Sequence, residues 1–349
     1  MSLLRTFILV VPLAWVASAA GADKVELVAG GTEGDLRLPF GVALDSDGNA
    51  FIVEFGGHRV RKADVKGTVT TIAGTGKKGD GGDGGPALKA EFNAPHSFAL
   101  AANGDIYLAD TLNNRVRKIT KKGVVSAFAG TGKAGFAGDG GPAARADFHG
   151  IYCVAFGPKQ ERLYLADLEN RRIRAIDMKT GVVTTVAGNG KRGVPQDGAD
   201  ARSAPLVDPR AVAVDSKGNV YVLERSGHAL RVVDADGKIR TVAGTGKAGY
   251  EGDGGAALKA RLNGPKHLCI DREDNVVIAD TDNHVIRKYL PREGKIVRVA
   301  GTGEEGSEGI GGLPKKCQLS QPHGVYVSAA GELYIADSFN NRVLRIRRK

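Results

Sequence analysis

Six side chains that could bind a charged ligand occur at one repeated position of this 349-residue chain. They are Phe40, His96, Tyr152, Arg210, Lys266 and His323, each directly after the opening residue of one copy of a sequence repeat. A position used only for packing should keep one residue type, whereas this one is mostly cationic, aromatic or polar. Guanidinium, ammonium and imidazole groups donate charge-assisted hydrogen bonds to carboxylate, sulfate or phosphate. The pattern predicts a site for a small acidic ligand or an acidic loop of a partner protein; the alternative is a water-filled hole with tolerant side chains.

A second set of candidates consists of acidic residues, one at the end of the second strand of each repeat copy. Its members are Glu54, Asp110, Asp167, Glu224, Asp280 and Asp337. Because an acid recurs in each copy, we expect it to accept hydrogen bonds from turn amides and from a nearby arginine: Arg59, Arg115, Arg172 or Arg342. Two copies have a histidine four residues after a glutamate, Glu54 with His58 and Glu224 with His228. Glu54 and Glu224 are therefore also candidate ligand-binding or acid–base residues.

The elements that must position these residues repeat six times. The copies begin at Pro39, Pro95, Ile151, Pro209, Pro265 and Pro322, at intervals of 56 to 58 residues. Within a copy, stretches such as 42–54 place apolar residues at period two on both sides of a tight turn, which is typical of a β-hairpin. Four short strands in each of six copies predict an all-β, six-bladed β-propeller, because each twisted sheet covers its faces only against its neighbours. The first strands should line the axis and place the six candidates at the channel mouth.

A ring of blades must also close. The sixth copy ends at Lys349 after its third strand, whereas residues 25–31 have the sequence of an isolated fourth strand. We therefore expect Val25 to Ala29 to complete the sixth blade as its outermost strand, held by backbone hydrogen bonds. Residues 23–349 should then form a single propeller domain.

The repeat resembles the NHL repeat, as in ANGDIYLADTLNNRVRKI at 102–119 and AAGELYIADSFNNRVLRI at 329–346. The resemblance covers essentially all of the chain after residue 22 and implies the propeller fold. It is less informative about function, because related propellers serve as binding platforms, as adhesion or signalling ectodomains, and occasionally as enzymes.

The Pro-His pairs at 95–96 and 322–323 are similar to those of amidating lyases, propellers of this kind that hold zinc with three histidines from alternate blades. Here the alternate blades would supply His96, Arg210 and His323. A guanidinium cannot serve as a metal ligand. His96 and His323 are thus only weak zinc candidates, and an extracellular lyase or hydrolase, possibly metal-dependent, is the alternative to a binding module.

Glycine-rich loops precede several blades, for example at 79–92, 138–148 and 252–262. Their glycines predict unusual backbone angles, and their alanine-rich ends predict a short helical turn. Each loop has one aspartate that could help to bind calcium, namely Asp83, Asp139 or Asp253. One carboxylate is few against the six to eight oxygens that calcium takes, so calcium is only a weak candidate cofactor.

Residues 1–22 contain Arg5, an apolar stretch at 7–16 and small residues at 17–22, which predicts a cleaved secretory signal peptide of a bacterial type. We therefore expect a secreted or periplasmic protein, without a transmembrane segment and monomeric. Removal of Arg5 lowers the net charge from +10 to 10 − 1 = +9. That charge is spread thinly over the repeats and few aromatic residues accompany it, so we expect no nucleic-acid partner. The three cysteines, Cys153, Cys269 and Cys317, indicate no disulfide framework.

Overall fold

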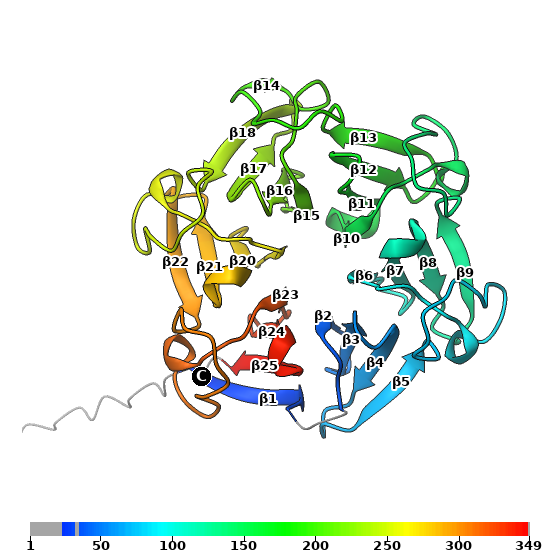
Figure 1. The fold of residues 1–349 in the computed structure, drawn as a ribbon, viewed down its shortest axis with the longest axis horizontal. Helices are drawn as coiled ribbons and strands as arrows, with labels where there is room; N and C mark the ends of the chain where they lie inside the picture. The colour runs from blue at the N-terminus through cyan, green and yellow to red at the C-terminus, as the bar shows by residue number, and fades with distance from the viewer. Residues whose placement is uncertain (1–22, 32–34, 348–349) are drawn as a thin grey trace, which may run out of the picture.

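The six repeat copies form six separate antiparallel sheets arranged around one axis (Figure 1). The structure, a computed structural model, describes residues 23–31 and 35–347. The predicted all-β, six-bladed β-propeller is confirmed, whereas the predicted signal peptide at 1–22 lies outside the described residues. No helix in the described part of the chain has the length and apolar character needed to cross a bilayer.

The first three blades each contain four strands, ordered from the axis outwards as they occur in the chain. Blade 1 contains β2 (Pro39–Leu44), β3 (Ala50–Glu54), β4 (Arg59–Ala63) and β5 (Val69–Ala73). Blade 2 contains β6 (Ser97–Leu100), β7 (Ile106–Asp110), β8 (Arg115–Ile119) and β9 (Val125–Ala129). Blade 3 contains β10 (Ile151–Phe156), β11 (Arg162–Asp167), β12 (Arg172–Asp177) and β13 (Val183–Ala187).

The last three blades repeat this order with one addition and one substitution. Blade 4 contains β15 (Pro209–Val214), β16 (Val220–Glu224), β17 (Ala229–Val233) and β18 (Lys238–Ala243), with the short β14 (Ala199–Asp200) outside β18. Blade 5 contains β19 (His267–Ile270), β20 (Val276–Asp280), β21 (Val285–Leu290) and β22 (Lys295–Ala300). Blade 6 contains β23 (Pro322–Val327), β24 (Leu333–Asp337), β25 (Arg342–Arg347) and, as its outermost strand, β1 (Lys24–Gly30).

Short 3-10 turns occur at three kinds of place. Four end the loops before blades, as predicted for three of them: η1 (Ala87–Lys89), η3 (Ala143–Arg145), η5 (Ala257–Lys259) and η7 (Pro314–Lys316). Three follow the second strand of a blade: η2 (Thr111–Asn113), η6 (Thr281–Asn283) and η8 (Ser338–Asn340). The remaining turn, η4 (Pro158–Gln160), joins β10 to β11.

The two ends of the described chain close the ring. β1 pairs antiparallel with β25, with Val25 opposite Ile346 and Ala29 opposite Val343. Glu26 adds an ion pair with Arg345 across the two strands, and the side chain of Val25 is buried. The expected closure by residues 25–29 is therefore confirmed, and the first strand β2 also contacts β23 of blade 6.

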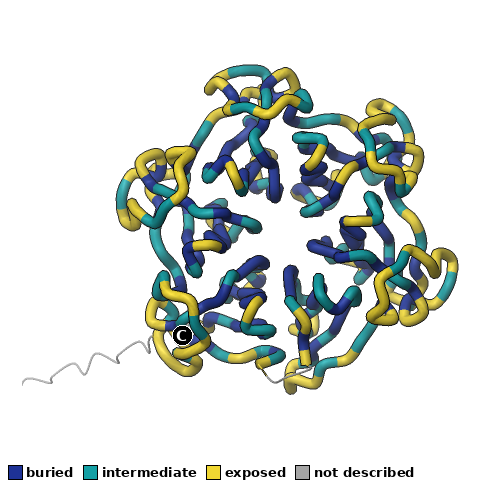
Figure 2. The backbone as a smooth tube through the Cα atoms, in the orientation of Figure 1, coloured by how far each residue is buried: buried dark blue, intermediate teal, exposed yellow. Residues whose placement is uncertain are grey.

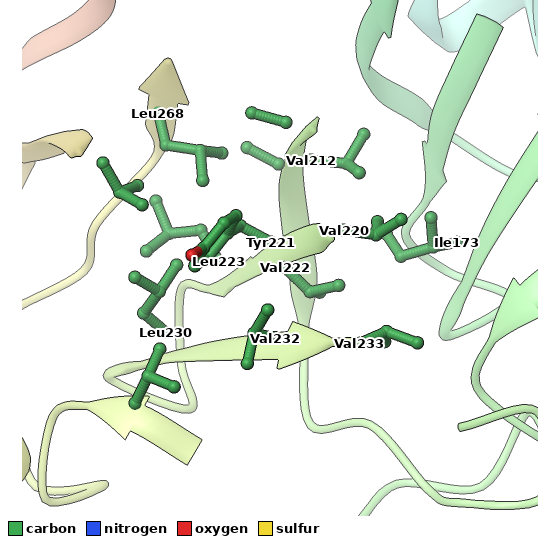
Figure 3. Close-up of a cluster of buried hydrophobic side chains, with 14 of the residues drawn as sticks. Ile173, Val212, Val220, Tyr221, Val222, Leu223, Leu230, Val232, Val233 and Leu268 are labelled. Carbon is green, nitrogen blue, oxygen red and sulfur yellow. The ribbon is translucent and has the colours of Figure 1, made fainter. Parts of the chain in front are cut away.

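The hydrophobic core is divided among the junctions between blades rather than gathered at one centre. One cluster joins blades 3, 4 and 5: Leu268 of blade 5 lies on the side of Leu223 of blade 4, and Ile173 of blade 3 lies on the opposite side, by Val220 (Figure 3). Other clusters join blades 1 and 2, 2 and 3, 5 and 6, and 6 and 1. The buried positions accordingly lie in the inner strands, while the outer loops are exposed (Figure 2). Each blade is stable only between two neighbours.

In blades 2 to 6, the loop before the blade covers the exposed edge of the outermost strand. In the loop before blade 2, the amide of Gly84 donates to the carbonyl of Val125 in β9, and the amide of Val125 donates to Gly85. Gly82 has φ +99°, and a Cβ there would lie 2.6 Å from the Cα of Ala90, so the chain turn requires glycine. The loops thus pair strand edges that would otherwise be open to other chains.

Candidate functional site

The six predicted ligand-binding residues, called the mouth residues below, lie at the axial end where the first strands begin. In blades 1, 3, 4 and 6 the pairing of first and second strands skips this residue, for example between Pro39 and Gly41. In blades 2 and 5 the first strand begins one residue later, at Ser97 and His267. A bulged or unpaired residue is released from the strand's alternation, and a bulge commonly re-aims a side chain at a site.

Five of the mouth residues form one continuous series of stacked, edge-to-face and cation–π contacts. The ring of Phe40 stacks on His323 with centroids 3.7 Å apart and lies 5.1 Å from His96. His96 in turn lies 4.5 Å from Tyr152. The guanidinium of Arg210 lies over the Tyr152 ring, 4.1 Å from its centroid. The structure therefore brings together side chains that five separate blades supply.

The sixth mouth residue, Lys266, extends from the stack toward solvent. Its Nζ lies 3.1 Å from Oε1 of Gln321, two residues before His323, and 3.3 Å from a carboxylate oxygen of Asp282. All six predicted residues therefore lie at one mouth, with Lys266 at its rim. That they bind a ligand stays a prediction.

Burial and positive charge lower the pKa values of four mouth residues. Burial, and then the charges of Arg210 and Lys266, lower the pKa of His96 and His323 well below the usual histidine value. Burial and the neighbouring Arg225 lower the pKa of Arg210 to about 10, and burial lowers that of Lys266. The imidazoles are neutral at pH 7, while the two cations keep their charge.

One guanidinium nitrogen at the mouth has no hydrogen-bond partner. Arg210 is 5% exposed, and its Nη1 is buried without a partner among the described residues. Oδ1 of Asp208, a residue that is 6% exposed, is unpaired in the same way. Buried polar groups in folded proteins are almost always paired, so each of these atoms needs an explanation.

The acids that end the second strands hold the loops in front of their blades. Each carboxylate accepts the backbone amide of the residue 17 or 18 positions earlier, at 2.6 to 2.8 Å; the donors are Arg37, Asn93, His149, Val207, Asn263 and Ser320. These amides belong to the loop before the first strand, not to the turn after the second strand. The structural role is supported, but the expected turn amides were the wrong donors.

The arginine partners also differ from the expected set. Arg59, Arg115 and Arg342 face their acids as expected, but Asp167 is faced by Arg174 at 3.8 Å rather than by Arg172. In blades 2, 3 and 5 the arginine seven residues after the acid is completely buried; these residues are Arg117, Arg174 and Arg287. Arg172 instead donates to the carbonyl of Asn170.

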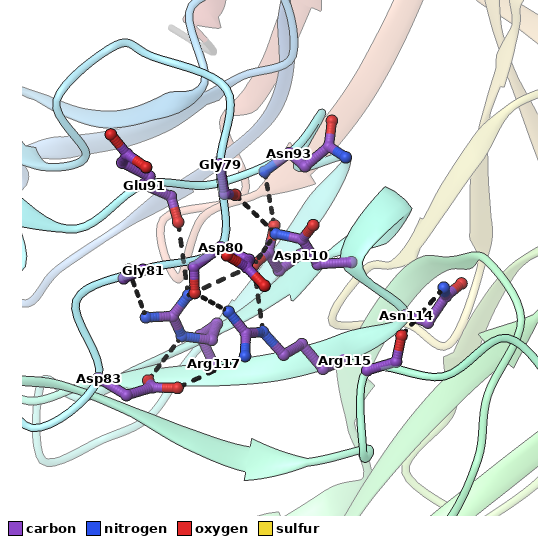
Figure 4. Close-up of polar contacts among 12 residues, drawn as sticks. Gly79, Asp80, Gly81, Asp83, Glu91, Asn93, Asp110, Asn114, Arg115 and Arg117 are labelled. Atoms are coloured by element: carbon purple, nitrogen blue, oxygen red, sulfur yellow. Dashed lines mark hydrogen bonds and ion pairs between the residues drawn. The ribbon is translucent and has the colours of Figure 1, made fainter.

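The buried arginines also form ion pairs with the three loop aspartates that were candidate calcium ligands. Asp83 lies 2.8 Å from Nε of Arg117, Asp139 lies 2.7 Å from Nη2 of Arg174, and Asp253 lies 2.9 Å from Nε of Arg287. Figure 4 shows Arg117 between Asp83 and the loop carbonyls. Each loop aspartate is therefore neutralised by a guanidinium, an arrangement that does not fit a calcium site.

The two Glu and His pairs, Glu54 with His58 and Glu224 with His228, make structural contacts of the same kind. Glu54 pairs with Arg59, and Glu224 accepts two bonds from Arg231, at 2.9 Å and 2.7 Å. His58 and His228 accept backbone amides of the following blade through Nδ1. The carboxylates face arginines instead of the mouth residues, so the geometry favours a structural role for both pairs.

The mouth does not fit a zinc ion. The ring of Phe40 contacts both His96 and His323, and the third ligand place is occupied by Arg210. Within residues 23–31 and 35–347, no three His, Cys, Asp or Glu side chains are placed so as to hold a metal ion. We derive no metal-dependent step.

Sequence reasoning missed three residues of the mouth. Phe55 stacks on Phe40 with centroids 4.6 Å apart, and Arg225 pairs with Asp208 at 3.0 Å. Phe55 and Arg225 occupy the position after the second-strand acid, where Thr111, Thr281 and Ser338 link to the next blade in blades 2, 5 and 6. Departure from the repeat at that position was a signal that could have found them.

An axial cavity of about 300 Å³ lies on the other side of the mouth residues. Its walls are the first strands of all six blades, and they are mainly apolar; they include Val42, Phe98, Val154, Val212, Leu268 and Val325. Two of the three unpaired cysteines, Cys153 and Cys269, also line it, and burial raises the pKa of Cys269 to about 12. The mouth residues do not line this cavity, so the mouth is a separate site.

Two family models match the chain. The model of the teneurin NHL domain matches residues 145–348, more than half of the chain, and that of the NHL repeat matches residues 92–119. The chain belongs to the NHL-repeat family. The NHL resemblance and the six-bladed fold are therefore in agreement.

Curated relatives of this NHL propeller are larger proteins. It is 27% identical over 324 residues to SUPPRESSOR OF QUENCHING 1, chloroplastic, of Arabidopsis thaliana, covering 89% of this chain and 30% of the relative. It is 27% identical to NHL repeat-containing protein 2 of Bos taurus, over 88% of this chain and 46% of the relative. Teneurin-3 of Mus musculus is 28% identical over 73% of this chain and 10% of its own length. The chain thus spans less than half of each.

Solved structures with the same fold have diverged far in sequence. An auxiliary nutrient binding protein from Bacteroides thetaiotaomicron gives a TM-score of 0.65 at 15% identity, over 94% of this chain and 77% of that one. A streptogramin B lyase gives 0.56 at 13% identity, over 94% and 98%. At such identities the likeness concerns the NHL-type propeller fold alone.

Proposed function

We propose that this NHL propeller is a secreted or periplasmic binding module that takes a small anionic ligand at the mouth residues. The observation that carries the proposal is the buried guanidinium of Arg210, whose Nη1 lacks a partner. A buried charge without a partner costs several kcal/mol, so an anion that supplied the missing acceptor would be bound with a corresponding gain. The export part of the proposal depends on the sequence of residues 1–22.

The electrostatics of the mouth favour an anion over a cation. Arg225 and Lys266 both act on the titration of Arg210 or of the histidines beside it. Neutral His96 and His323 add no net charge to the mouth. In each, Nδ1 donates to a backbone carbonyl, that of Ala94 or of Gln321, so the donors to an anion are the cationic side chains. Charge-assisted bonds from a guanidinium to a carboxylate are among the stronger hydrogen bonds in proteins.

Arg210 lies between the aromatic residues of the mouth and a second arginine. The Tyr152 ring covers its guanidinium on one side. Arg225 is close enough for its charge to lower the pKa of Arg210, and the Arg225 side chain is 42% exposed and paired with Asp208. The ligand would contact Arg210 beside the aromatic rings.

The alternative, an extracellular lyase or hydrolase, gains no specific support. Its acid–base candidates Glu54 and Glu224 face arginines, and His96 and His323 contact Phe40. We therefore keep the binding role as the single proposal.

The test is binding of acetate, citrate, sulfate and phosphate to the mature protein, measured by thermal shift and calorimetry. We expect at least one anion to bind and the double variant Arg210→Ala, Lys266→Ala to lose it. A double variant at exposed residues, Arg240→Ala with Lys295→Ala, removes the same charge elsewhere and should bind as the wild type. Equal affinity in both double variants would refute the proposal.

A further inference from the structure

Five of the six junctions between blades share one hydrogen bond, called the seam bond below. The side chain that closes the turn after the second strand accepts the backbone amide of the residue just before the next blade. The five pairs are His58 with Ala94, Asn114 with Gly150, His228 with Gly264, His284 with Gln321, and Asn341 with Leu38, at 2.8 to 3.2 Å. Every acceptor has a φ between 45° and 55°.

The junction between blades 3 and 4 breaks this rule. Arg171 occupies the acceptor position with φ 49°, but a guanidinium has donors only and cannot accept an amide. The residue just before blade 4 is Asp208. Its φ is not positive, whereas its five counterparts at the other junctions have φ between 47° and 69°. The seam bond has thus been replaced on both sides by charged residues.

The altered seam leaves three buried polar atoms unpaired within the described residues: Nε of Arg171, Oδ1 of Asp208 and Nη1 of Arg210. The other oxygen of Asp208 is occupied, because it accepts from Nε of Arg225 at 3.0 Å and from Oγ of Ser226 at 2.8 Å. Arg210 and Asp208 therefore offer a donor and an acceptor close enough for the charge of one to act on the other. A simple anion could satisfy Arg210 but not the carboxylate oxygen of Asp208.

We infer that the ligand of this mouth is zwitterionic, an α-amino acid or a molecule ending in one, bound at the seam of blades 3 and 4. Its carboxylate accepts from Nη1 of Arg210, and its ammonium group donates to Oδ1 of Asp208, whose charge already acts on Arg210. The inference rests on the proposed function and narrows it from anions in general to one class. The Tyr152 ring, stacked on Arg210, provides an apolar surface for the remainder of the molecule.

Matched ligands separate this inference from the proposed function. Calorimetry would compare L-phenylalanine, L-leucine and L-glutamate with the corresponding acids that lack the amino group. We expect at least one amino acid to bind ten-fold or more tightly than its deaminated acid. Equal affinity within every pair, or no binding of either member, would overturn the inference and leave the anion site standing. Failure of acetate, citrate, sulfate and phosphate to bind as well would overturn both.

Two variants of the seam test the assignment of atoms. Asp208→Asn removes the acceptor charge, so the amino acid and its deaminated acid should then bind within two-fold of each other. Asp236→Asn, at an exposed aspartate, is the control and should keep the preference. A preference that survives Asp208→Asn would exclude Asp208 as the ammonium partner.

The double variant Arg171→Asn, Asp208→Gly rebuilds the Asn114 and Gly150 seam in this place. We expect it to fold, to gain a few degrees in Tm from the restored seam bond, and to lose amino-acid binding. Thermal melting followed by circular dichroism measures folding and the gain in Tm without any ligand present. A double variant that folds and still binds the amino acid with wild-type preference would refute the seam site.

Discussion

The ring of Phe40 is stacked on the imidazole of His323, with centroids 3.7 Å and planes 9° apart. One residue belongs to the first blade and the other to the last, so the stack spans the junction at which the ring closes. The same Phe40 ring also contacts Phe55 and His96. Packing at the mouth and closure of the propeller are therefore coupled through one side chain.

Replacing Phe40 by alanine should destabilise the protein. The side chain is 7% exposed and contacts three rings, and truncation of a buried phenylalanine costs about 3–5 kcal/mol. Urea unfolding followed by circular dichroism measures the change. Phe339→Ala is the control, because Phe339 is 50% exposed and its loss should cost about 0.5 kcal/mol or less. Equal costs for the two variants would contradict the packing described.

Closure of the ring by β1 can be tested by substituting one buried and one exposed side chain of this strand. Val25 is 1% exposed and Leu27 is 46% exposed. Val25→Asp buries an unpaired charge and should cost several kcal/mol, with Leu27→Asp as the mild control. Deletion of residues 23–30 should lower Tm more than either substitution. A deletion that leaves Tm unchanged would mean that β1 does not hold the ring.

The completely buried Arg174 should be needed for stability in a pH-dependent manner. Arg174→Met leaves Asp167 and Asp139 without their guanidinium and should cost about 3–5 kcal/mol, while Arg162→Met, on the surface, should cost little. Burial already raises the pKa of Asp167 to about 6. A carboxyl with a raised pKa in the folded state loses stability as the pH rises through that value. The Tm deficit of Arg174→Met should therefore be larger at pH 8 than at pH 5.

Acid should weaken the propeller through His267. Burial lowers its pKa from 6.5 to about 4, and its Nδ1 accepts the backbone amide of Val325. Because the folded pKa is lowered, the unfolded chain takes up the proton first, and stability falls as the pH drops below about 6.5. This histidine alone should account for about 3 kcal/mol by pH 4. His267→Gln keeps an acceptor and should flatten that loss, whereas His149→Gln, at an exposed histidine, should not.

The fold was predictable because its information is local and repeated six times. Period-two hairpins and regular spacing required a ring of sheets, and the strand-like residues 25–29 required a partner in the last blade. The convergence of the mouth residues followed from their position directly before the axial strands. Each of these inferences needed only the alternation of side chains and the count of repeats.

Other features depend on contacts that no repeat count reveals. Arg115 lies close to Asp110 in the sequence and pairs with it in the strand register, so it was expected to be the partner of that carboxylate. The buried partner is Arg117, because the loop at 79–83 folds over it. Likewise, Arg171 and Asp208 look like tolerated surface variation until the seam bonds of the other junctions are known. Loop placement and unpaired atoms require coordinates.

The sixth blade is built from both ends of the propeller, since β1 must wait for β25. Ribosomal synthesis delivers β25 last, so no nascent chain can complete this sheet before translation of the repeats has ended. The ring therefore stays open until β25 is available to pair with β1. The order in which strands emerge thus makes final assembly a post-translational event.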